Sequence, residues 1–341
     1  MKKSLMTLGV LALFVLMAYG QEKKFALYSV AFYNMENLFD TIHDEGKNDY
    51  EYLPNGTNQW NTMKYKAKLK NMSEILSMLS TDKLPMGPAI IGVSEIENYR
   101  VLEDILKQPA LADKGYQYVH YEGEDRRGVD CAFFYNPKLF ELTNSKLVPY
   151  VYINDTVHKT RGFLIASGNI AGEKMHFIVN HWPSRAAASP ARERAGKQVR
   201  AIKDSLLRED SAAKIVIMGD MNDDPMDKSM AVALGAKRKP ADVGPTDLYN
   251  PWWDTLKKGY GTLMYKGKWN LFDQIVFTGN LLGTDRSTLK FYKHEIFRRD
   301  FMFQKEGKYK GYPKRTQAGG VWLNGYSDHL PTIIYLIKEV K

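Results

Sequence analysis

The sequence predicts an α/β fold in which apolar strands and amphipathic helices alternate in both halves of the chain. Runs such as residues 89–93 and 213–218 have the composition of strands buried on both faces. Between such runs, apolar residues recur every three or four positions, as in residues 62–80. Two sheets stacked face to face, each covered outside by helices, would bury such strands on both faces.

In the first half, residues 25–32, 89–93 and 129–135 are predicted strands because they are apolar and rich in β-branched and aromatic residues. Residues 62–80 and 99–107 are predicted helices. The longer helix should cover a sheet with an apolar stripe made of Tyr65, Leu69, Met72, Ile75, Leu76 and Leu79.

In the second half, the same criteria predict one helix at residues 190–209 and strands at 162–170, 174–179, 213–218, 273–277 and 332–337. The remaining segments contain many Gly, Pro, Asn, Tyr and Trp residues and are predicted loops, at 40–61, 236–262 and 280–326. We expect these loops to surround the mouth of a site and to decide its substrate.

The N-terminus has the pattern of a secretory signal peptide over residues 1–20. Lys2 and Lys3 precede the apolar residues 5–17, and small residues lie before Gln21. We therefore expect export to a periplasm or the extracellular space without a stable membrane anchor; the alternative is a retained anchor. Cys131 is the only cysteine, which excludes both a lipid-bearing cysteine at the cleavage site and an internal disulfide.

Residues 21–341 are predicted to form a single domain, because they contain no linker-like or low-complexity stretch and the chain is 44% hydrophobic. The formal charge is +9, and loss of Lys2 and Lys3 leaves +7. A basic surface favours anionic partners, although it equally serves solubility. Nothing in the sequence indicates a protein partner, and we expect a monomer.

Polar residues cluster where several apolar runs end. Asp220 and Asn222 follow the run 215–218, and on an extended backbone positions i and i+2 point the same way. In chain order the polar motifs are Asn34-Met35-Glu36-Asn37, Ser94-Glu95, Asn180-His181-Trp182, Gly219-Asp220-Met221-Asn222, Phe272-Asp273-Gln274 and Ser327-Asp328-His329-Leu330-Pro331. Residues at strand ends converge in one crevice because a rigid scaffold aims them there.

This ordered set of motifs, from about residue 25 to 337, resembles the endonuclease/exonuclease/phosphatase superfamily, whose members share the pancreatic deoxyribonuclease fold. The resemblance implies a four-layered α/β/β/α sandwich, in which two mixed sheets pack face to face with helices outside. It implies an exported bacterial-type phosphoesterase whose site lies where the strands of both sheets end. The superfamily includes nucleases, inositol-phosphate phosphatases and sphingomyelinases, so the substrate stays open.

The resemblance also implies a hard divalent cation, which prefers carboxylate and amide oxygens. Glu95 matches the family's main metal ligand, and the resemblance places Asn34 close to it in the site. Glu36 and Asp328 are expected to contribute less, directly or through water. We expect Mg²⁺, with Mn²⁺ or Ca²⁺ as alternatives. Glu36 departs from the family, which often has aspartate at that position.

Four residues match the family's catalytic groups. Asp220 and Asn222 correspond to the pair that orients the attacking water and contacts the phosphate, and Asp220 should stay ionised near a metal. His181 and His329 correspond to the two histidines that donate hydrogen bonds to the scissile group.

Histidines of this kind need an acceptor on the second ring nitrogen to fix the tautomer. Asp273 fits that role for His329, and Asp130 is the candidate for His181, although Asp130 could equally be a solvated aspartate at a strand start. Arg127 and Arg185 are candidate contacts to flanking phosphates, with a plain surface role as the alternative.

The function expected from these residues is metal-assisted hydrolysis of a phosphate ester by water, with DNA or RNA as substrate. The basic charge and the stretch 308–315 with interleaved tyrosines suit a polyanion with stackable bases. A phosphatase or lipid phosphodiesterase acting on an inositol phosphate or a sphingomyelin-like head group stays open. A deep, narrow pocket in place of an open basic groove would favour it, as would exposed apolar loops near Trp252 that mark a membrane-docking patch. A binding protein that kept only the scaffold is the third alternative, although none of the motif residues is missing.

Overall fold

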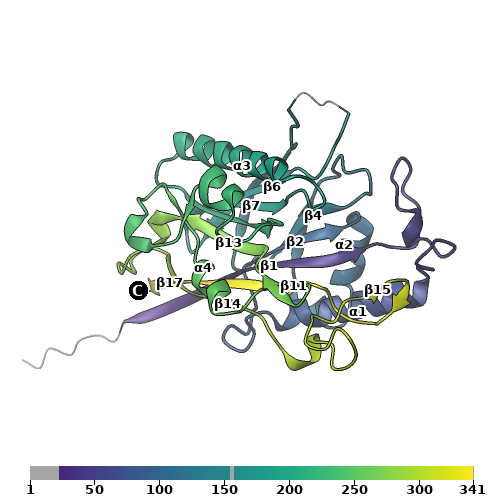
Figure 1. Cartoon of the computed structure of the whole chain (residues 1–341). Helices are drawn as coiled ribbons and strands as arrows, with labels where there is room; N and C mark the ends of the chain where they lie inside the picture. Colours follow the sequence, from purple (N-terminus) through teal and green to yellow (C-terminus); the bar gives the residue numbers. More distant parts are fainter. Residues whose placement is uncertain (1–22, 154–156, 341) are drawn as a thin grey trace, which may run out of the picture.

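The computed structural model describes residues 23–153 and 157–340 (Figure 1), so the leader predicted at residues 1–20 lies outside the described residues. The larger strands are β1 (Lys24–Leu38), β2 (Ile90–Ile96), β3 (Gln117–His120), β4 (Asp130–Tyr135), β5 (Glu141–Val148), β6 (Phe163–Ile170), β7 (Glu173–His181), β8 (Lys214–Asp220), β13 (Asp273–Thr278), β14 (Lys290–Ile296) and β17 (Thr332–Val340). The shorter strands are β9 (Ala236–Lys237), β10 (Leu248–Tyr249), β11 (Leu263–Tyr265), β12 (Lys268–Asn270), β15 (Gln317–Ala318) and β16 (Val321–Trp322). The α-helices are α1 (Thr62–Met78), α2 (Tyr99–Leu106), α3 (Ser189–Glu209) and α4 (Trp253–Lys257).

Short helical turns occupy several of the connections between these elements. The single π-helical turn among the described residues is η3 (Ser229–Leu234), which packs beside α3. The 3₁₀ turns are η1 (Tyr50–Tyr52), η2 (Ala112–Lys114), η4 (Pro240–Asp242), η5 (Gly279–Leu281) and η6 (Asp300–Met302).

The strands form two large mixed sheets that pack face to face. One sheet has the order β14-β17-β1-β2-β4-β3, and the other has the order β5-β6-β7-β8-β13-β10-β9. Their shared core contains side chains from both sheets, including Val30, Phe32, Phe177 and Met218. At Gly92 the sheets approach so closely that an added Cβ would lie 2.5 Å from the sulfur of Met218.

Helices cover both outer faces of this pair of sheets (Figure 1). On one side, apolar residues of α1 and α2, such as Leu69 and Leu102, pack against the first sheet. On the other side, Val199 of α3 packs against residues of the second sheet, such as Ile178 and Ile217. The protein therefore has the four-layered α/β/β/α sandwich that the sequence predicts, with each strand of the sheet centres buried on both faces.

Three strands extend beyond their predicted ends, because backbone pairing continues after the apolar run stops. β1 reaches Leu38, β7 reaches His181 and β8 reaches Asp220, so the polar motifs begin inside the strands. The prediction that residues 280–326 form only loops is wrong. β14 lies within that range as an edge strand beside β17, and its half-buried residues include several polar ones.

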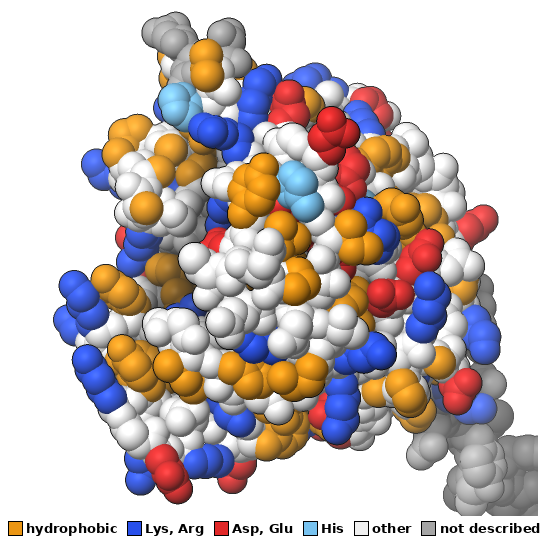
Figure 2. Space-filling view, turned by 90° about the vertical axis from the view of Figure 1, so that its right-hand side faces the viewer, with side chains coloured by type: hydrophobic (Ala, Val, Ile, Leu, Met, Phe, Trp, Pro, Cys, Tyr) orange, Lys and Arg blue, Asp and Glu red, His pale blue; other side chains and the backbone are white. Residues whose placement is uncertain are grey.

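Helix α1 begins after Asn61, whose side chain accepts a hydrogen bond from the backbone nitrogen of Lys64, and ends two residues before the predicted boundary. No described helix has both the length and the apolar character needed to cross a membrane. On the face shown in Figure 2, Lys and Arg side chains are spread widely with Asp and Glu side chains among them. Cys131 is buried between the two sheets, where burial raises the pKa of its thiol.

Candidate active site

The polar motifs of both sheets meet at one edge of the sandwich. In the first sheet, Asn34 of β1 pairs in parallel register with Ser94 of β2, directly before Glu95. In the second sheet, His181 of β7 and Asp273 of β13 flank Asp220 at the end of β8. The strand ends therefore gather residues separated by up to 239 positions, from Asn34 to Asp273, into one cluster.

The backbone at Glu95 is irregular in a way that aims its side chain into this cluster. Glu95 has a φ of 58°, and the ladders that join β2 to its neighbours shift register around it. Such a bulge redirects one side chain at the end of a strand. The Glu95 carboxylate accepts hydrogen bonds from the side-chain nitrogen of Asn34 at 3.2 Å and from the backbone nitrogen of Asn37 at 2.9 Å.

Gly219 allows β7 and β8 to lie close together just before the site. It has a φ of 158°, and a Cβ added there would lie 2.3 Å from the backbone oxygen of Asn180. No other residue type fits that position without a shift of the backbone. The glycine in the Gly219-Asp220 motif thus serves the geometry of Asp220.

Asp220 and Asn222 are joined by a turn, so the expectation that they project together from an extended strand is wrong. β8 ends at Asp220, and Asn222 has a φ of 51°. Its backbone nitrogen donates to Asp220 Oδ1 at 2.9 Å, and its side-chain nitrogen donates to the carbonyl of Trp182 at 3.0 Å. An aspartate that accepts a hydrogen bond from the backbone two residues later is an Asx turn, and this turn fixes both side chains.

His329 and Asp273 form the pair that the sequence predicts. His329 Nδ1 lies 2.7 Å from Asp273 Oδ2, and His329 Nε2 lies 3.9 Å from Asp220 Oδ2. Burial disfavours a charged imidazole, but the carboxylates of Asp273 and Asp220 outweigh burial and raise the pKa of His329 well above its usual value. These carboxylates therefore favour the protonated form of the ring, whose Nε2 faces the cluster.

Asp220 is fully buried, and its surroundings oppose its negative charge. Burial raises its pKa to about 7, an effect that His329 opposes and that Asp273 and Glu95 strengthen. Asn34 stabilises the carboxylate by donating a hydrogen bond to Asp220 Oδ2 at 3.0 Å. A carboxylate whose pKa lies near neutral pH is suited to accept a proton.

His181 lies on the other side of the same carboxylates. Its Nε2 is 3.7 Å from both Glu95 Oε1 and Asp220 Oδ2, which is too far for a direct hydrogen bond. Burial, together with the positive charges of Arg161 and Arg127, lowers the pKa of His181 well below its usual value, so the ring is neutral. Among the described residues, its Nδ1 has no hydrogen-bond partner.

The prediction that Asp130 orients His181 is wrong. Asp130 turns toward β3 and its following loop, where its carboxylate lies 3.2 Å from His120 Nε2 and accepts a hydrogen bond from the backbone nitrogen of Gly123 at 3.0 Å. β4 lies between β2 and β3, so a residue at its start has neighbours on both sides. The pattern of the sequence does not distinguish those two sides.

Glu36 and Asp328 lie beside the cluster but are held by basic residues. Glu36 accepts hydrogen bonds from Arg315 Nε at 3.0 Å and from the backbone nitrogen of Thr316 at 2.6 Å, and it lies 3.7 Å from Lys68 Nζ. Asp328 accepts from Arg315 Nη2 at 2.8 Å. The other oxygen of Asp328, Oδ1, lies 3.9 Å from His329 Nε2. The expected contribution of Glu36 and Asp328 to the cation site, directly or through water, stays a prediction.

Burial and neighbouring charges shift the pKa values of both Glu36 and Lys68. Burial and the nearby Asp328 raise the pKa of Glu36 to about 7, although Lys68 and Arg315 oppose the change. Burial lowers the pKa of Lys68 to about 8, against the attraction of Glu36. Lys68 was predicted only as part of a helix, and nothing in the apolar stripe of α1 indicates that it points inward.

The two predicted phosphate contacts are engaged with protein groups. Arg185 donates to the backbone oxygen of Asn222 at 3.1 Å and to Asp227 at 2.9 Å, and its guanidinium lies 4.4 Å from the centre of the Phe272 ring. Arg127 is half exposed, and its Nε lies 3.4 Å from Asp125 Oδ1. Arg185 thus supports the turn at Asn222, and contact of either arginine with substrate stays a prediction.

Arg161 is a site residue that the sequence does not indicate. It is buried, pairs with Asp125 at 3.0 Å and donates to the carbonyl of Trp182 at 2.9 Å. The same carbonyl accepts the side chain of Asn222. Arg161 therefore holds the backbone that connects His181 to the Asx turn, and its place just before a strand carries no signal of that role.

The donors of this cluster fit a divalent cation. One ligand atom each from Glu95, His181 and Asp220 lies within 4.8 Å of the others, and the amide of Asn34 contacts both carboxylates. Two carboxylates with an amide nearby are the ligands of a hard cation. A cation held there would neutralise the oxygens of a phosphate and make phosphorus easier to attack.

The fold and this site define a metal-dependent hydrolase of phosphate esters. The family model described as Endonuclease/Exonuclease/phosphatase family matches residues 29–338, and the chain belongs to that family. A comparison with curated protein sequences finds no significant match.

Solved structures with the same fold share little sequence with this chain. A family protein from Bacteroides thetaiotaomicron has a TM-score of 0.57 at 15% identity, covering 93% of this chain and 97% of that one. A mannosyl-6-phosphatase from the same organism has a TM-score of 0.56 at 15% identity, with 91% and 99% covered. TDP2 from D. rerio, complexed with a single-strand DNA product, has a TM-score of 0.52 at 14% identity, with 91% and 99% covered. At such identities the similarity establishes the fold.

Proposed function

We propose that this protein is an exported, Mg²⁺-dependent nuclease that hydrolyses phosphodiester bonds of DNA or RNA with water as the nucleophile. The observation that carries the proposal is the placement of the charged His329, backed by Asp273, 3.9 Å from the buried carboxylate of Asp220. A cation and a proton acceptor facing the same small space, beside Glu95, are what hydrolysis of a phosphate diester requires.

Asp220 is the residue placed to orient and deprotonate the attacking water. Its Oδ1 is held by the backbone of Asn222, and its Oδ2 faces Asn34, His181 and His329. Because the side chain is fixed on both sides, no reorientation is needed when the proton moves. Asn222 fixes one wall of the space through its bond to the carbonyl of Trp182.

His329 is placed to donate a hydrogen bond from Nε2 to a phosphate oxygen as negative charge increases. Asp273 holds its Nδ1, so that the tautomer and the charge are maintained. The neutral His181 offers a second ring to the same space without adding repulsion between two cations. Glu95, with Asn34 beside it, is the residue that would hold Mg²⁺, which leaves Asp220 as the acceptor of the water's proton.

Nucleic acid is favoured over the other phosphate esters by charge and by the surroundings of the site. The chain is basic, which attracts a polyanion at long range. A lipid phosphodiesterase is less favoured, because Trp252, around which a membrane-docking patch was expected, is fully buried and donates a hydrogen bond to the carbonyl of Ile275. Export is part of the proposal because the charged and apolar pattern of residues 1–20 is that of a signal peptide.

The proposal is tested by incubating the mature protein with plasmid DNA, single-stranded DNA, RNA, inositol phosphates, sphingomyelin and a sugar phosphate, with Mg²⁺ and with chelator. We expect Mg²⁺-dependent cleavage of nucleic acid. Hydrolysis of phosphomonoesters alone, or of sphingomyelin alone, would refute a nuclease function.

Glu95→Gln should abolish most of the activity, because it removes a negative ligand while keeping the size of the side chain. The matched control is Glu141→Gln on β5, where an exposed carboxylate accepts a hydrogen bond from the side chain of Asn169 at 3.0 Å. Equal turnover by the wild type and Glu95→Gln would show that the cation site is assigned wrongly.

A further inference from the structure

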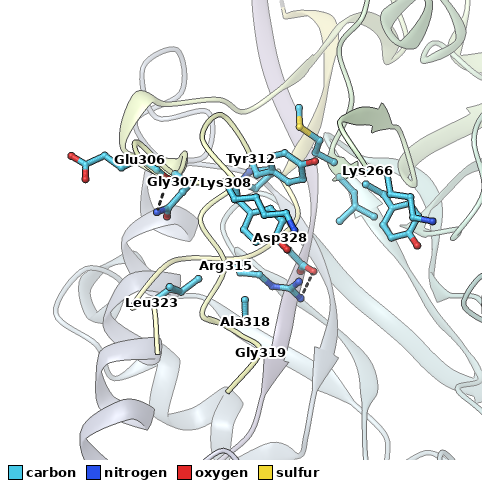
Figure 3. A pocket seen from close by; sticks show the side chains of 16 residues that line it. Lys266, Glu306, Gly307, Lys308, Tyr312, Arg315, Ala318, Gly319, Leu323 and Asp328 are labelled. Atoms are coloured by element: carbon cyan, nitrogen blue, oxygen red, sulfur yellow. Dashed lines mark hydrogen bonds and ion pairs between the residues drawn. The ribbon is translucent and has the colours of Figure 1, made fainter. Parts of the chain in front are cut away.

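A cavity of about 750 Å³ opens beside the active site (Figure 3). Its walls come from three segments that are far from the catalytic motifs in sequence: residues 263–266, 304–313 and 315–323. In Figure 3, Lys266 and Leu323 lie on opposite sides of the cavity, and Glu306 points away from it. Lys308 and Tyr312 lie above the ion pair of Arg315 and Asp328 in this view. The proposed catalytic chemistry uses none of the side chains of these three segments.

One residue of the cavity lining adjoins the catalytic His329. Asp328, which lines it, precedes His329, and His329 pairs through its backbone with Leu263 of the opposite wall. The backbone nitrogen of Leu330 also donates to the carbonyl of Thr262 at 2.9 Å. The cavity therefore lies next to His329 in the fold, where a group attached to the scissile phosphate would be within its reach.

The lining combines flat aromatic surface with positive charge. Tyr265 is 62% exposed and Tyr309 is 51% exposed, and the rings of Tyr309 and Tyr312 lie 5.4 Å apart. Lys266 Nζ lies 5.3 Å from the centre of the Tyr265 ring, and Lys308 Nζ lies 5.6 Å from the centre of the Tyr309 ring. Within the described residues, neither lysine has a carboxylate at ion-pair distance, so both charges are available to a ligand.

We propose that this cavity binds a nucleobase and the phosphate that flanks it, on the strand being cleaved, and so selects single-stranded nucleic acid; this inference rests on the proposed nuclease function. The base would stack on Tyr309 or Tyr265, because aromatic side chains bind bases through their π faces. Lys266 and Lys308 would neutralise the flanking phosphate. A paired base cannot enter without leaving its duplex.

Other ligands fit these walls less well. A sugar or inositol phosphate presents many hydroxyl groups, and the part of the lining made by Met264, Pro313 and Leu323 offers those hydroxyls no partner. The tail of a lipid would place apolar surface against the two lysines. The flat rings and unpaired cations together match a base and a phosphate.

Arg315 connects the cavity wall to the catalytic strands. It donates to Glu36 at the end of β1 and to Asp328 beside His329, at 3.0 and 2.8 Å. The wall is therefore fixed relative to the residues that act on phosphorus. A base would be bound equally in the ground state and the transition state, because it lies away from the reacting phosphorus, so its contacts should change KM rather than kcat.

The test compares Tyr309→Ala and Tyr265→Ala with the wild type on a single-stranded oligonucleotide and on the same oligonucleotide with abasic sites. Each variant should raise KM for the normal oligonucleotide about tenfold and leave kcat within about twofold. On the abasic oligonucleotide the variants and the wild type should be equal. Tyr309→Phe should restore KM, and Tyr292→Ala, an exposed tyrosine of β14 outside the cavity, should have no effect.

Binding measured with chelator separates this inference from the proposed function. A single-stranded DNA containing 2-aminopurine should lose fluorescence on stacking against the wild type and not against Tyr309→Ala. Such quenching without any cleavage in Mg²⁺ would support the cavity and refute the nuclease. Normal cleavage of both oligonucleotides by Tyr309→Ala and Tyr265→Ala with unchanged KM would refute the cavity and leave the nuclease standing. Tyr309-dependent hydrolysis of inositol phosphates or sphingomyelin vesicles, but not of oligonucleotides, would refute both.

Discussion

The side chain of Asn34, from the first sheet, donates a hydrogen bond to the carboxylate of Asp220, from the second sheet, at 3.0 Å. The same nitrogen lies 3.2 Å from Glu95. One amide thus lies between the buried carboxylate of Asp220 and the partly buried carboxylate of Glu95, and it spans the interface between the sheets. The site exists only where the two sheets are packed together.

Replacing Asn34 should weaken the cation site. Asn34→Ala removes the shared donor, and Asn34→Asp adds a third negative charge beside Glu95 and Asp220. We expect Asn34→Ala to reduce Mg²⁺ affinity about 10- to 100-fold, as for other residues that orient metal ligands. Calorimetric titration of Mg²⁺ measures this, with Asn169→Ala on β6 as the matched control. Unchanged affinity in Asn34→Ala would contradict the assignment.

His329 and Asp273 should act as a unit. His329→Gln should lower kcat about 10²- to 10⁴-fold because the donor to phosphate is no longer charged. Asp273→Asn should lower kcat by a similar factor, since it removes the carboxylate that holds Nδ1 at 2.7 Å. The double variant should be little worse than either single variant. Multiplicative losses in steady-state kinetics would show that the two residues act independently.

Gly219→Ala should destabilise the fold and reduce activity together. The new methyl group would lie 2.3 Å from the backbone oxygen of Asn180, so β7 and β8 must separate next to Asp220. We expect a loss of about 1–3 kcal/mol in the free energy of unfolding. Gly267→Ala is the control, because it also has a positive φ but has open space around it. Equal urea midpoints for the two variants would contradict the steric explanation.

Stability should fall in mild acid through His294. Burial, with a smaller effect of Lys258, lowers the pKa of His294 to about 4, so the folded protein resists protonation of this ring. Its contribution to stability is complete above pH 6.5, where the ring is neutral in both states, and is lost as pH falls toward 4 because the unfolded chain binds the proton first.

His294→Gln keeps a group able to contact the Thr255 hydroxyl, which lies 2.9 Å from His294 Nε2, but does not titrate. In urea unfolding at pH 7 and pH 5, the free energy of unfolding should fall less for this variant than for the wild type. Parallel losses in the two proteins would show that other groups cause the acid sensitivity.

The sequence predicts the layered fold and most of the cluster because both depend on local patterns. Apolar strands separated by amphipathic helices predict a layered α/β fold, and the resemblance of the motifs to a known family predicts two stacked sheets. Polar residues at the strand ends then converge at one edge of the sheets. Asp220, His329, Glu95 and Asn34 meet for that reason.

The remaining contacts depend on which neighbour a side chain turns toward, and the sequence does not carry that information. Asp130 turns to His120 rather than to His181, and Glu36 turns to Arg315. Arg161 acts through a backbone carbonyl, so its residue type alone reveals nothing. The edge strand β14 escapes prediction because its half-buried sequence has little apolar periodicity.

Cys131, the single cysteine, is enclosed between the two sheets, so the reactivity of its thiol reports when the sheets separate. An alkylating reagent should reach the sulfur when the two sheets separate. The same separation would break the hydrogen bond between Asn34 and Asp220. Labelling kinetics can therefore count how often an intact molecule transiently loses its catalytic centre, without any added dye or engineered tag.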